Sequence, residues 1–357
     1  MIRRLEARGF RNLVFQSWEP VEGRNLLLGP NGAGKTSVLE AIYVAATTRS
    51  FRTPRLSDCV NLEEETLFLR LDVDSGHRLE LGWEPGARRR AVDGQEVGVT
   101  EYLRHLPVVV WTADTGEILT GEPKRGRRLM DRGVVGTRPG DLGILRRYRK
   151  VLEQKRELLS RGGTGGLASW NDLLAEAAVD VVKRRREYVD RLREALQWAR
   201  VQTDLEGPPP ELLYRPSPPE AAEGEAALRE TLEKASDRER ERGIPLMGPH
   251  RDKLRFRWRG RSLHRLASAG ERKGMGLLLV AAEGRVLSRA GREPVLLLDD
   301  LDSELDASRL EAVWPAFEPA RQVFATSSRP GVWSALEPAV RWRVEEGRIH
   351  REKETGS

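Results

Sequence analysis

The sequence predicts an α/β fold that carries an antiparallel β layer and an inserted helical arm. A short apolar run precedes a glycine-rich loop and a helical stretch between residues 24 and 44. A second apolar run ends in two acids at residues 293–300. Between them the hydrophobic pattern changes from a period of two over residues 66–83 to helical spacing over residues 140–200. A core made of two distant segments with a long insertion fits this order.

Length and composition favour a multidomain protein without a membrane span. At 357 residues, with 39% hydrophobic residues, the chain can fill two or three cores. We expect the N-terminal part of the core at 1–121, the helical arm at 122–243 and the C-terminal part of the core at 244–357. No apolar stretch approaches the ~18 residues of a membrane span, which excludes a spanning segment but not docking on membrane proteins. Cys59 is the only cysteine, so a cytoplasmic location is expected.

The charge balance is basic. There are 61 Lys and Arg residues against 55 Asp and Glu residues, which gives a net charge of +6. Such an excess is typical of proteins with polyanionic partners such as nucleic acids. An arginine-rich chain whose charges are merely solvated would give the same balance, so charge alone leaves both readings open.

The first apolar run leads into a loop that fits a phosphate. Residues 29–36 match the pattern G-x-x-x-x-G-K-[ST] at every fixed position: Gly29, Pro30, Asn31, Gly32, Ala33, Gly34, Lys35 and Thr36. Glycines allow consecutive N–H groups to surround a phosphate, and the following helix adds its dipole. We expect Lys35 to reach the β- and γ-phosphates of ATP and the Thr36 hydroxyl to bind Mg²⁺. A chance glycine turn would not need a strand before it and a helix after it.

The second apolar run ends in Asp299 and Asp300. Asp299 is expected to hold Mg²⁺, directly or through water, and Asp300 to activate the attacking water. The alternative for this pair is a helix N-cap. Arg11 lies between two expected strands before the loop, where it either contacts the phosphates or adenine of ATP or is a surface arginine. Ser268 and Gly270 stand at the start of an expected helix over residues 272–288, where they would form a second phosphate site for ATP held by a partner subunit.

Two helices joined by a glycine turn at residues 162–166 are expected to form the arm. Their apolar residues recur at helical spacing: Leu142, Leu145, Tyr148, Leu152 and Leu159, then Trp170, Leu173, Leu174, Ala177, Val181, Tyr188, Leu192 and Leu196. Basic residues fall on the outer face: Arg146, Arg147, Lys183, Arg184, Arg185 and Arg186. Residues 253–259 alternate as a strand with Arg255 and Arg257 on its basic face. These residues are candidates for DNA contacts; solvated charges, or a strand edge blunted by charge, are the alternatives.

Together these motifs resemble the SMC class of ABC-type ATPases, and within it the chain is similar to the RecF family of bacterial recombination mediators. The resemblance covers nearly the whole chain and depends on the order of the motifs. Besides the loop at 29–36, it is carried by Phe10–Asn12, Arg49–Thr53, Arg128–Asp131, Tyr148 with Leu152–Arg156, Gly248–Asp252, Ala267–Glu271, Leu296–Asp300 and Ser303–Asp306.

The resemblance implies an ABC/SMC-type ATPase head. It implies an ATP-dependent homodimer that binds DNA at single-strand/double-strand junctions and helps RecR and RecO load RecA at gaps, with slow, DNA-stimulated ATP hydrolysis. Ser268 would contact the γ-phosphate of the opposite subunit's ATP, with Gly270 beside it. Ser303 and Asp306 would lie at the dimer seam, and Thr326 would take the place of the switch residue.

Two other functions are weighed against this one. A metal-dependent nuclease coupled to an ATPase would take its metal ligands from residues 250–252 (His-Arg-Asp) and 300–302 (Asp-Leu-Asp), but the five histidines show no metal-ligand spacing. An ATPase subunit of a transporter would have a membrane partner and no affinity for DNA.

Overall fold

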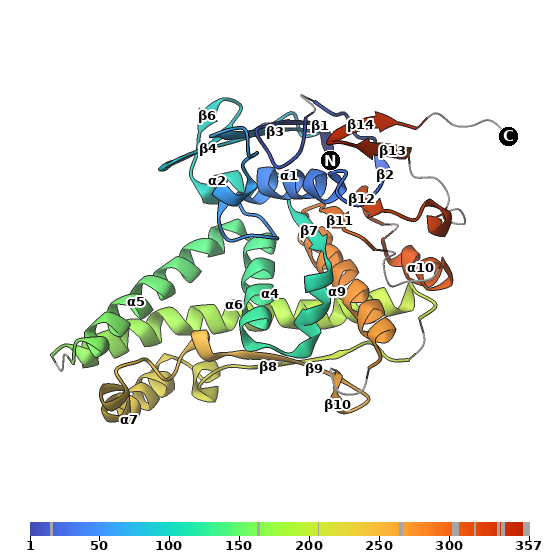
Figure 1. The fold of residues 1–357 in the computed structure, drawn as a ribbon. Coiled ribbons are helices and arrows are strands. Elements are labelled where there is room, and N and C mark those ends of the chain that lie inside the picture. Colours follow the sequence, from blue (N-terminus) through green and yellow to red (C-terminus); the bar gives the residue numbers. More distant parts are fainter. Residues whose placement is uncertain are drawn as a thin grey trace. The chain divides into compact units, whose positions relative to one another are not determined.

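A computed structural model describes residues 1–14, 17–162, 165–205, 207–263, 267–301, 307–317, 319–333, 336 and 340–352. The chain forms two compact units (Figure 1). The first consists of residues 1–116, 195–207 and 268–357, and the second of residues 117–194 and 208–267. No helix in the described part of the chain is both long and apolar enough to cross a membrane.

The first unit contains two β-sheets and the helices that pack on them. Its elements are β1 (Ile2–Arg8), β2 (Gly23–Leu28), α1 (Lys35–Thr47), η1 (Leu56–Cys59), β3 (Leu67–Val73), β4 (Arg78–Glu84), β5 (Ala87–Val92), β6 (Gln95–Glu96), α2 (Val99–Tyr102), β7 (Val108–Trp111), α3 (Ala113–Gly116), α9 (Ala269–Arg289), β11 (Val295–Leu298), α10 (Ala307–Val313), η6 (Trp314–Phe317), β12 (Gln322–Ser327), η7 (Pro330–Trp333), β13 (Val340–Glu345) and β14 (Arg348–Arg351).

A six-stranded sheet with the order β14-β13-β2-β12-β11-β7 forms the centre of this unit. Five of its strands run parallel, and the edge strand β14 pairs antiparallel with β13. A five-stranded antiparallel sheet, β1-β3-β4-β5-β6, confirms the β layer expected over residues 66–83. Helix α1 packs between the two sheets and is buried along nearly its whole length (Figure 1).

Strand alternation explains why the central sheet is covered on both faces. Leu297 and Phe324 belong to the core that α1 shares with the antiparallel sheet. Neighbouring residues point the other way: a side chain at Gly284 of α9 would meet Leu296, and one at Gly276 would meet Trp111. Helix α9 therefore covers the opposite face. Parallel sheets buried on both sides require continuous apolar strands, which residues 295–298 supply.

The second unit is the predicted helical arm with a small sheet. Its elements are η2 (Glu117–Thr120), α4 (Pro123–Thr137), η3 (Pro139–Asp141), α5 (Leu142–Ser160), α6 (Leu167–Val201, whose last turns belong to the first unit), β8 (Glu211–Arg215), η4 (Pro219–Ala222), α7 (Glu225–Arg242), η5 (Pro249–Arg251), β9 (Lys253–Trp258) and β10 (Arg261–Ser262). The sheet order is β10-β9-β8, all antiparallel.

Most of the predicted arm stripe is buried, and part of it lies in one core that α5, α6 and α7 share: Leu145, Tyr148, Leu152, Leu174, Ala177 and Val181. Three positions differ from the prediction: Leu173 is 40% exposed, and Leu142 and Trp170 are only partly buried. Strand β9 alternates as expected, with Leu254, Phe256 and Trp258 buried. The arm is helical from Pro123, a residue that suits the first turn of a helix.

The domain boundaries also differ from the expected ones. The sequence suggested a return to the core near residue 244, but residues 208–267 pack with the arm. The reason is strand pairing: β8 pairs with β9 over five residues, from Glu211↔Arg257 to Arg215↔Lys253. Strand β9 therefore belongs to the sheet that β8 begins, and the first unit resumes only at Ser268.

Buried ion pairs connect the elements of the arm. The Arg185 guanidinium donates to Asp131 and to Asp252, at 2.8 Å each, and Tyr214 donates to the same Asp252 carboxylate at 2.6 Å. Lys155 of α5 and Glu239 of α7 form a second pair with an Nζ–Oε2 distance of 2.6 Å and both side chains fully buried. Breaking such a pair by removing one partner is costly because it leaves an uncompensated buried charge.

His250 is held as a neutral ring. Its Nδ1 lies 2.7 Å from the Tyr148 hydroxyl, and its Nε2 lies 3.3 Å from the Pro245 carbonyl. This geometry suits a tautomer that donates from Nε2 to the carbonyl and accepts at Nδ1 from the hydroxyl. Burial lowers the pKa of His250 to about 4, and nearby arginines add to this lowering.

The arm should consequently lose stability in mild acid. In the unfolded chain the histidine has a pKa near 6.5, whereas the folded His250 becomes protonated only near pH 4. Between these values the unfolded state binds more protons, so the stability of the folded state falls as the pH drops. Between pH 7 and pH 5 the wild type should lose about 2 kcal/mol more unfolding free energy than His250→Gln. Urea unfolding at both pH values measures this, and equal losses in the two proteins would contradict it.

Candidate nucleotide site

The glycine-rich loop and the acidic strand end meet at one edge of the central sheet. Strand β2 ends at Leu28, which pairs with Ser327 of β12, and β11 ends at Leu298, which pairs with Ala325 of the same strand. Because these strands run parallel, their carboxyl ends lie side by side. The loop after β2 and the acids after β11 are therefore separated by the width of one strand.

The loop leads directly into α1. Gly34 is the N-cap residue at a φ of 110°, and among the described residues no side chain caps the helix. The first backbone N–H groups of a helix have no partner inside it and favour an anion. Lys35 is only 8% exposed, and its Nζ donates to the carbonyl oxygens of Gly29 at 2.7 Å and Pro30 at 2.9 Å. The ammonium group therefore lies across the mouth of the loop.

Asp299 joins the two halves of the site. Its Oδ1 accepts from the Thr36 hydroxyl at 2.9 Å, across 263 positions of sequence, and from the Thr326 hydroxyl at 2.9 Å. Burial raises the pKa of the Asp299 carboxyl although the two hydroxyl groups oppose this. The hydroxyl and carboxylate oxygens are the hard donors that Mg²⁺ prefers, so Thr36 and Asp299 would hold that ion.

Asp300 follows in an unusual backbone conformation. Its φ is 49°, and its N–H donates to the Thr326 hydroxyl at 2.7 Å. The Asp300 side chain is exposed, whereas that of Asp299 is partly buried. Aspartate tolerates the left-handed region better than most residues, and strained conformations gather at functional sites. The two acids therefore differ in exposure, and their separate roles in holding Mg²⁺ and activating water stay predictions.

The structure places Arg11 in an ion pair beside the loop. Its guanidinium donates to both oxygens of the Glu40 carboxylate, at 2.8 and 2.9 Å. The Glu40 side chain is fully buried and also accepts from Ser50 and from Arg52. Burial alone would raise the pKa of Glu40, but the hydrogen bonds from Arg11 and Ser50 outweigh it and the pKa is lowered. Contact between Arg11 and ATP stays a prediction.

Two segments far apart in sequence touch the loop backbone. Asn12 Nδ2 donates to the Gly32 carbonyl at 3.0 Å, and Asn12 Oδ1 accepts from the Ser37 hydroxyl at 2.8 Å. From the other end of the chain, the Gly347 N–H in the β13–β14 turn donates to the Ala33 carbonyl at 2.9 Å. The loop is thus held between an N-terminal turn and a C-terminal hairpin.

Ser268 is the N-cap of α9. Its Oγ accepts from the Glu271 N–H at 3.3 Å, and its own N–H donates to Glu271 at 2.7 Å, which forms a capping box. At Gly270 an added Cβ would lie 1.9 Å from Arg309 of α10, so this guanidinium occupies the space that a side chain would need. Ser303 and Asp306 lie outside the described residues, and their predicted position at a dimer seam is untested.

The comparisons with known proteins agree over the whole chain. A curated "DNA replication and repair protein RecF" from Geotalea daltonii is 30% identical and covers 98% of this chain and 99% of its own length. Another from Anaeromyxobacter is 34% identical, with 97% of each chain covered. The chain belongs to the RecF family. No protein-family model matches it.

Solved structures agree with this assignment. The structure described as the recombination mediator protein RecF with ATP in the RecFOR pathway matches with a TM-score of 0.88 at 26% identity, covering 99% of this chain and 97% of that one. The Smc head domain derived from Pyrococcus furiosus matches with a TM-score of 0.53 at 13% identity, which shows the fold alone. The prediction of an ABC/SMC-type ATPase head is therefore confirmed.

Membership of the RecF family argues against the alternative hypothesis of a metal-dependent nuclease. Among the described residues, no three His, Cys, Asp or Glu side chains gather so that they could hold a metal ion. His250 and Asp252 bind Tyr148, Arg185 and Tyr214 inside the arm.

The structure separates the basic residues that the sequence grouped together. Arg185 is 4% exposed and paired with two carboxylates, so its predicted place on an outer basic face is wrong. Arg184 is partly buried and pairs with Asp141 and Glu187, and Arg147 pairs with Glu176 at 2.8 Å. The remaining candidates are exposed: Arg146, Lys183, Arg186, Arg255 and Arg257.

Sequence reasoning gave no role to several residues around the RecF loop. Asn12 was part of the resemblance only, although it follows Arg11 in a turn. Glu40 could have been noticed as a lone acid in an otherwise apolar helix. The hairpin that contains Gly347 has a sequence signal, because residues 340–345 and 348–351 alternate around a Glu-Gly turn.

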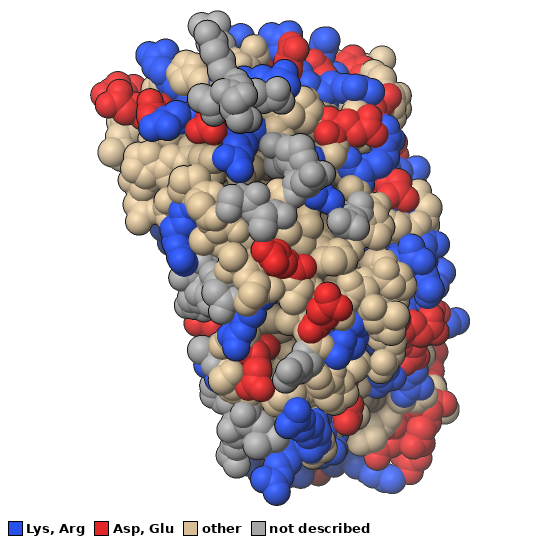
Figure 2. Space-filling view, turned by 90° about the vertical axis from the view of Figure 1, so that its right-hand side faces the viewer, with Lys and Arg blue, Asp and Glu red and all other residues tan. Residues whose placement is uncertain are grey.

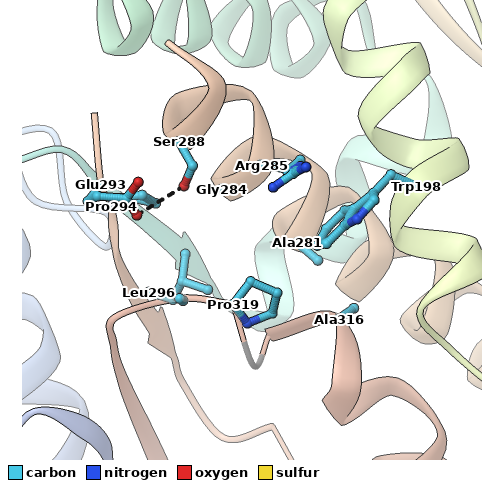
Figure 3. A pocket seen from close by; sticks show the side chains of 11 residues that line it. Trp198, Ala281, Gly284, Arg285, Ser288, Glu293, Pro294, Leu296, Ala316 and Pro319 are labelled. Atoms are coloured by element: carbon cyan, nitrogen blue, oxygen red, sulfur yellow. Dashed lines mark hydrogen bonds between the residues drawn. The ribbon is translucent and has the colours of Figure 1, made fainter. Parts of the chain in front are cut away.

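A separate pocket in the first unit is too small to be the nucleotide site. Arg285 of α9 lies over the Trp198 ring, 4.8 Å from its centroid, and Ser288 donates to Glu293 at 3.3 Å (Figure 3). The volume of about 120 Å³ is below the ~300–1,000 Å³ of typical ligand pockets. None of residues 29–36 lines it.

Removing the ammonium group of Lys35 should abolish nucleotide binding. Lys35→Met keeps the aliphatic stem but leaves the phosphates without their cation, so the Kd for ATP should rise by at least 100-fold, about 2.8 kcal/mol. Titration with a fluorescent ATP analogue measures it, and Lys234→Met, on the exposed face of α7, is the control. ATP affinity like that of the wild type in Lys35→Met would refute the phosphate-loop assignment.

Proposed function

We propose that this RecF-family protein binds ATP and Mg²⁺ at the loop formed by residues 29–36, dimerises on ATP and binds DNA in recombinational repair. The observation that carries the proposal is the contact of Thr36 and Thr326 with Asp299, at 2.9 Å each. It brings the phosphate loop and the acidic strand end together with oxygen donors suited to Mg²⁺. The relative solved with ATP, which aligns over 99% of this chain, supports the choice of nucleotide.

The dimer proposal depends on a second phosphate site at the N-terminus of α9, which would bind the ATP held by another copy of the chain. Ser268 is exposed at the N-terminus of α9, with Gly270 beside it and Arg309 next to that glycine. A hydroxyl group and a cation at a helix N-terminus suit the γ-phosphate of ATP bound to a second copy. ATP held between two copies favours the dimer because only the dimer gives it both sets of contacts.

DNA binding is supported by basic residues that carboxylates do not neutralise. Arg88 lies near Arg49 and Arg90; burial and these two like charges lower the pKa of Arg88. In the described part of the chain, none of these three forms an ion pair with an acid, and phosphates would relieve their repulsion. On the face drawn in Figure 2, blue and red side chains are interspersed.

We infer that the DNA partner is a structure rather than a sequence, namely the single-strand/double-strand junction of a gap, because phosphate contacts carry no base information. The protein would then act with RecR and RecO to load RecA and would hydrolyse ATP slowly unless DNA is present. In this cycle Asp300 would activate the water and Lys35 would stabilise the γ-phosphate. A cytoplasmic location follows from these partners.

ATP hydrolysis measured against protein concentration, with and without a gapped duplex, tests the dimer and DNA parts of the proposal. We expect a rate per subunit that rises with concentration and rises again with the gapped DNA. A fully double-stranded duplex of equal length is the matched control and should stimulate less. A rate that stays flat with concentration and ignores DNA would overturn the dimer and DNA parts while leaving ATP binding intact.

Ser268→Arg should separate ATP binding from dimerisation. The bulky cation at the α9 N-terminus would block approach of a second copy, while the bound ATP of the same chain keeps its contacts. Light scattering with ATP should therefore show a monomer with normal ATP affinity. Ser160→Arg, at the exposed end of α5, should dimerise like the wild type. An ATP-dependent dimer of Ser268→Arg would show that the site does not act between copies.

Charge reversal should identify the DNA-contacting face of the arm. Lys183→Glu with Arg186→Glu spares the buried Arg185 and removes two phosphate contacts, so the slope of log K against log salt should become shallower by about 1.8. The control carries the same charge change at two ion-paired positions, Arg161→Glu with Lys234→Glu. Equal DNA affinity and equal slope in both double variants would mean that Lys183 and Arg186 lie on a solvated face that does not contact DNA.

A further inference from the structure

Two contacts fix neighbouring peptide planes of the phosphate loop. The plane between Gly32 and Ala33 is held by Asn12, whose Nδ2 donates to the Gly32 carbonyl at 3.0 Å. The plane between Ala33 and Gly34 is held by Gly347, whose N–H donates to the Ala33 carbonyl at 2.9 Å. Neither partner belongs to the loop, and they come from opposite ends of the chain.

These contacts set the direction of the N–H groups that a phosphate needs. In a trans peptide the C=O and N–H groups point in opposite directions. The carbonyls of Gly32 and Ala33 point outward to their partners, so the N–H groups of Ala33 and Gly34 point away from them. The Ala33 N–H indeed turns back into the loop, 3.3 Å from the Pro30 carbonyl. Backbone N–H groups turned into a loop in this way can line the concave surface that binds anions.

The two partners are also packed against each other. Gly347 has a φ of +74°, and a Cβ added there would lie 1.8 Å from the Asn12 carbonyl oxygen, a backbone atom that cannot swing aside. The Gly347 carbonyl in turn accepts from the Val14 N–H at 3.1 Å. Only glycine fits this turn, and the turn cannot shift without moving the Asn12 segment.

We propose that Asn12 and Gly347 are positioning residues that hold the phosphate loop in the shape that takes the β- and γ-phosphates, without touching the nucleotide themselves. The inference rests on the proposed ATP site at residues 29–36. It makes the C-terminal hairpin β13–β14 part of the nucleotide site, although this hairpin contains no residue with phosphate-binding chemistry in its turn.

A pair of glycine variants tests the hairpin. Gly347→Ala and Gly76→Ala both place alanine at a positive φ in a hairpin turn, +74° and +84°, so the backbone strain is alike. At Gly76 nothing lies within 4 Å of the added Cβ. Gly347→Ala should raise the Kd for ATP about tenfold, which is about 1.4 kcal/mol, and Gly76→Ala should stay within twofold. A fluorescent ATP analogue gives both values.

A pair of asparagine variants tests the other contact and decides the matter should Gly347→Ala not fold. Asn61 Nδ2 donates to the Arg11 carbonyl at 2.6 Å and so steadies the same turn by a different bond. Asn12→Ala should raise the Kd for ATP about tenfold, whereas Asn61→Ala should lower the nucleotide-free melting temperature and leave the Kd within threefold. Asn12→Asp keeps the acceptor for Ser37 but loses the donor, so it should bind no better than Asn12→Ala.

The outcomes separate this inference from the proposed function. If the wild type binds ATP but Asn12→Ala binds equally well, or if each variant matches its control, the positioning role is wrong and the ATP site stands. If the wild type does not bind ATP, or if Lys35→Met binds as the wild type does, the proposed function fails and this inference fails with it.

Discussion

The site depends on one constraint, the parallel alignment of β2, β12 and β11. A strand contributes nothing to phosphate or metal binding by itself, but parallel strands end at the same edge. The apolar side chains of β11 and β12 hold this alignment from both faces, against α1 and α9. Thr326 then lies at the end of the middle strand, where its hydroxyl reaches Asp299 at 2.9 Å. Residues 263 positions apart become neighbours through strand pairing and through the hydrophobic packing that holds these strands in place.

A second set of polar contacts holds the phosphate loop in place, after the sheet has brought it close to Asp299. Glu40 is fully buried and would destabilise α1 as an unpaired charge, but Arg11 contacts both of its carboxylate oxygens. That pair anchors the turn from which Asn12 reaches the loop. On the other side, the β13–β14 turn contributes a backbone N–H. The loop is therefore ordered by neighbours that need no nucleotide, which reduces the entropy that binding must overcome.

The sequence was a good guide wherever local chemistry decides the outcome. The phosphate loop, the apolar strand before Asp299, the two arm helices and the alternation of β9 were all predictable, because residue period and loop glycines act over a few positions. Net charge was a poorer guide. Arg184 and Arg185 belong to a basic run, yet each has acidic partners from elsewhere in the arm, and no run of letters shows which cations are neutralised.

By itself, then, the sequence determined the element types, the loop that suits a phosphate, the order of motifs and hence the RecF family. Only the tertiary structure decided that Asn12 and Gly347 share the loop, that Arg185 is buried and that β9 belongs to the arm's sheet. The physical reason is the distance along the sequence over which each kind of interaction acts. Periodicity and turn chemistry act between neighbours, whereas burial, ion pairing and strand partnership depend on which distant segments the packed core brings together.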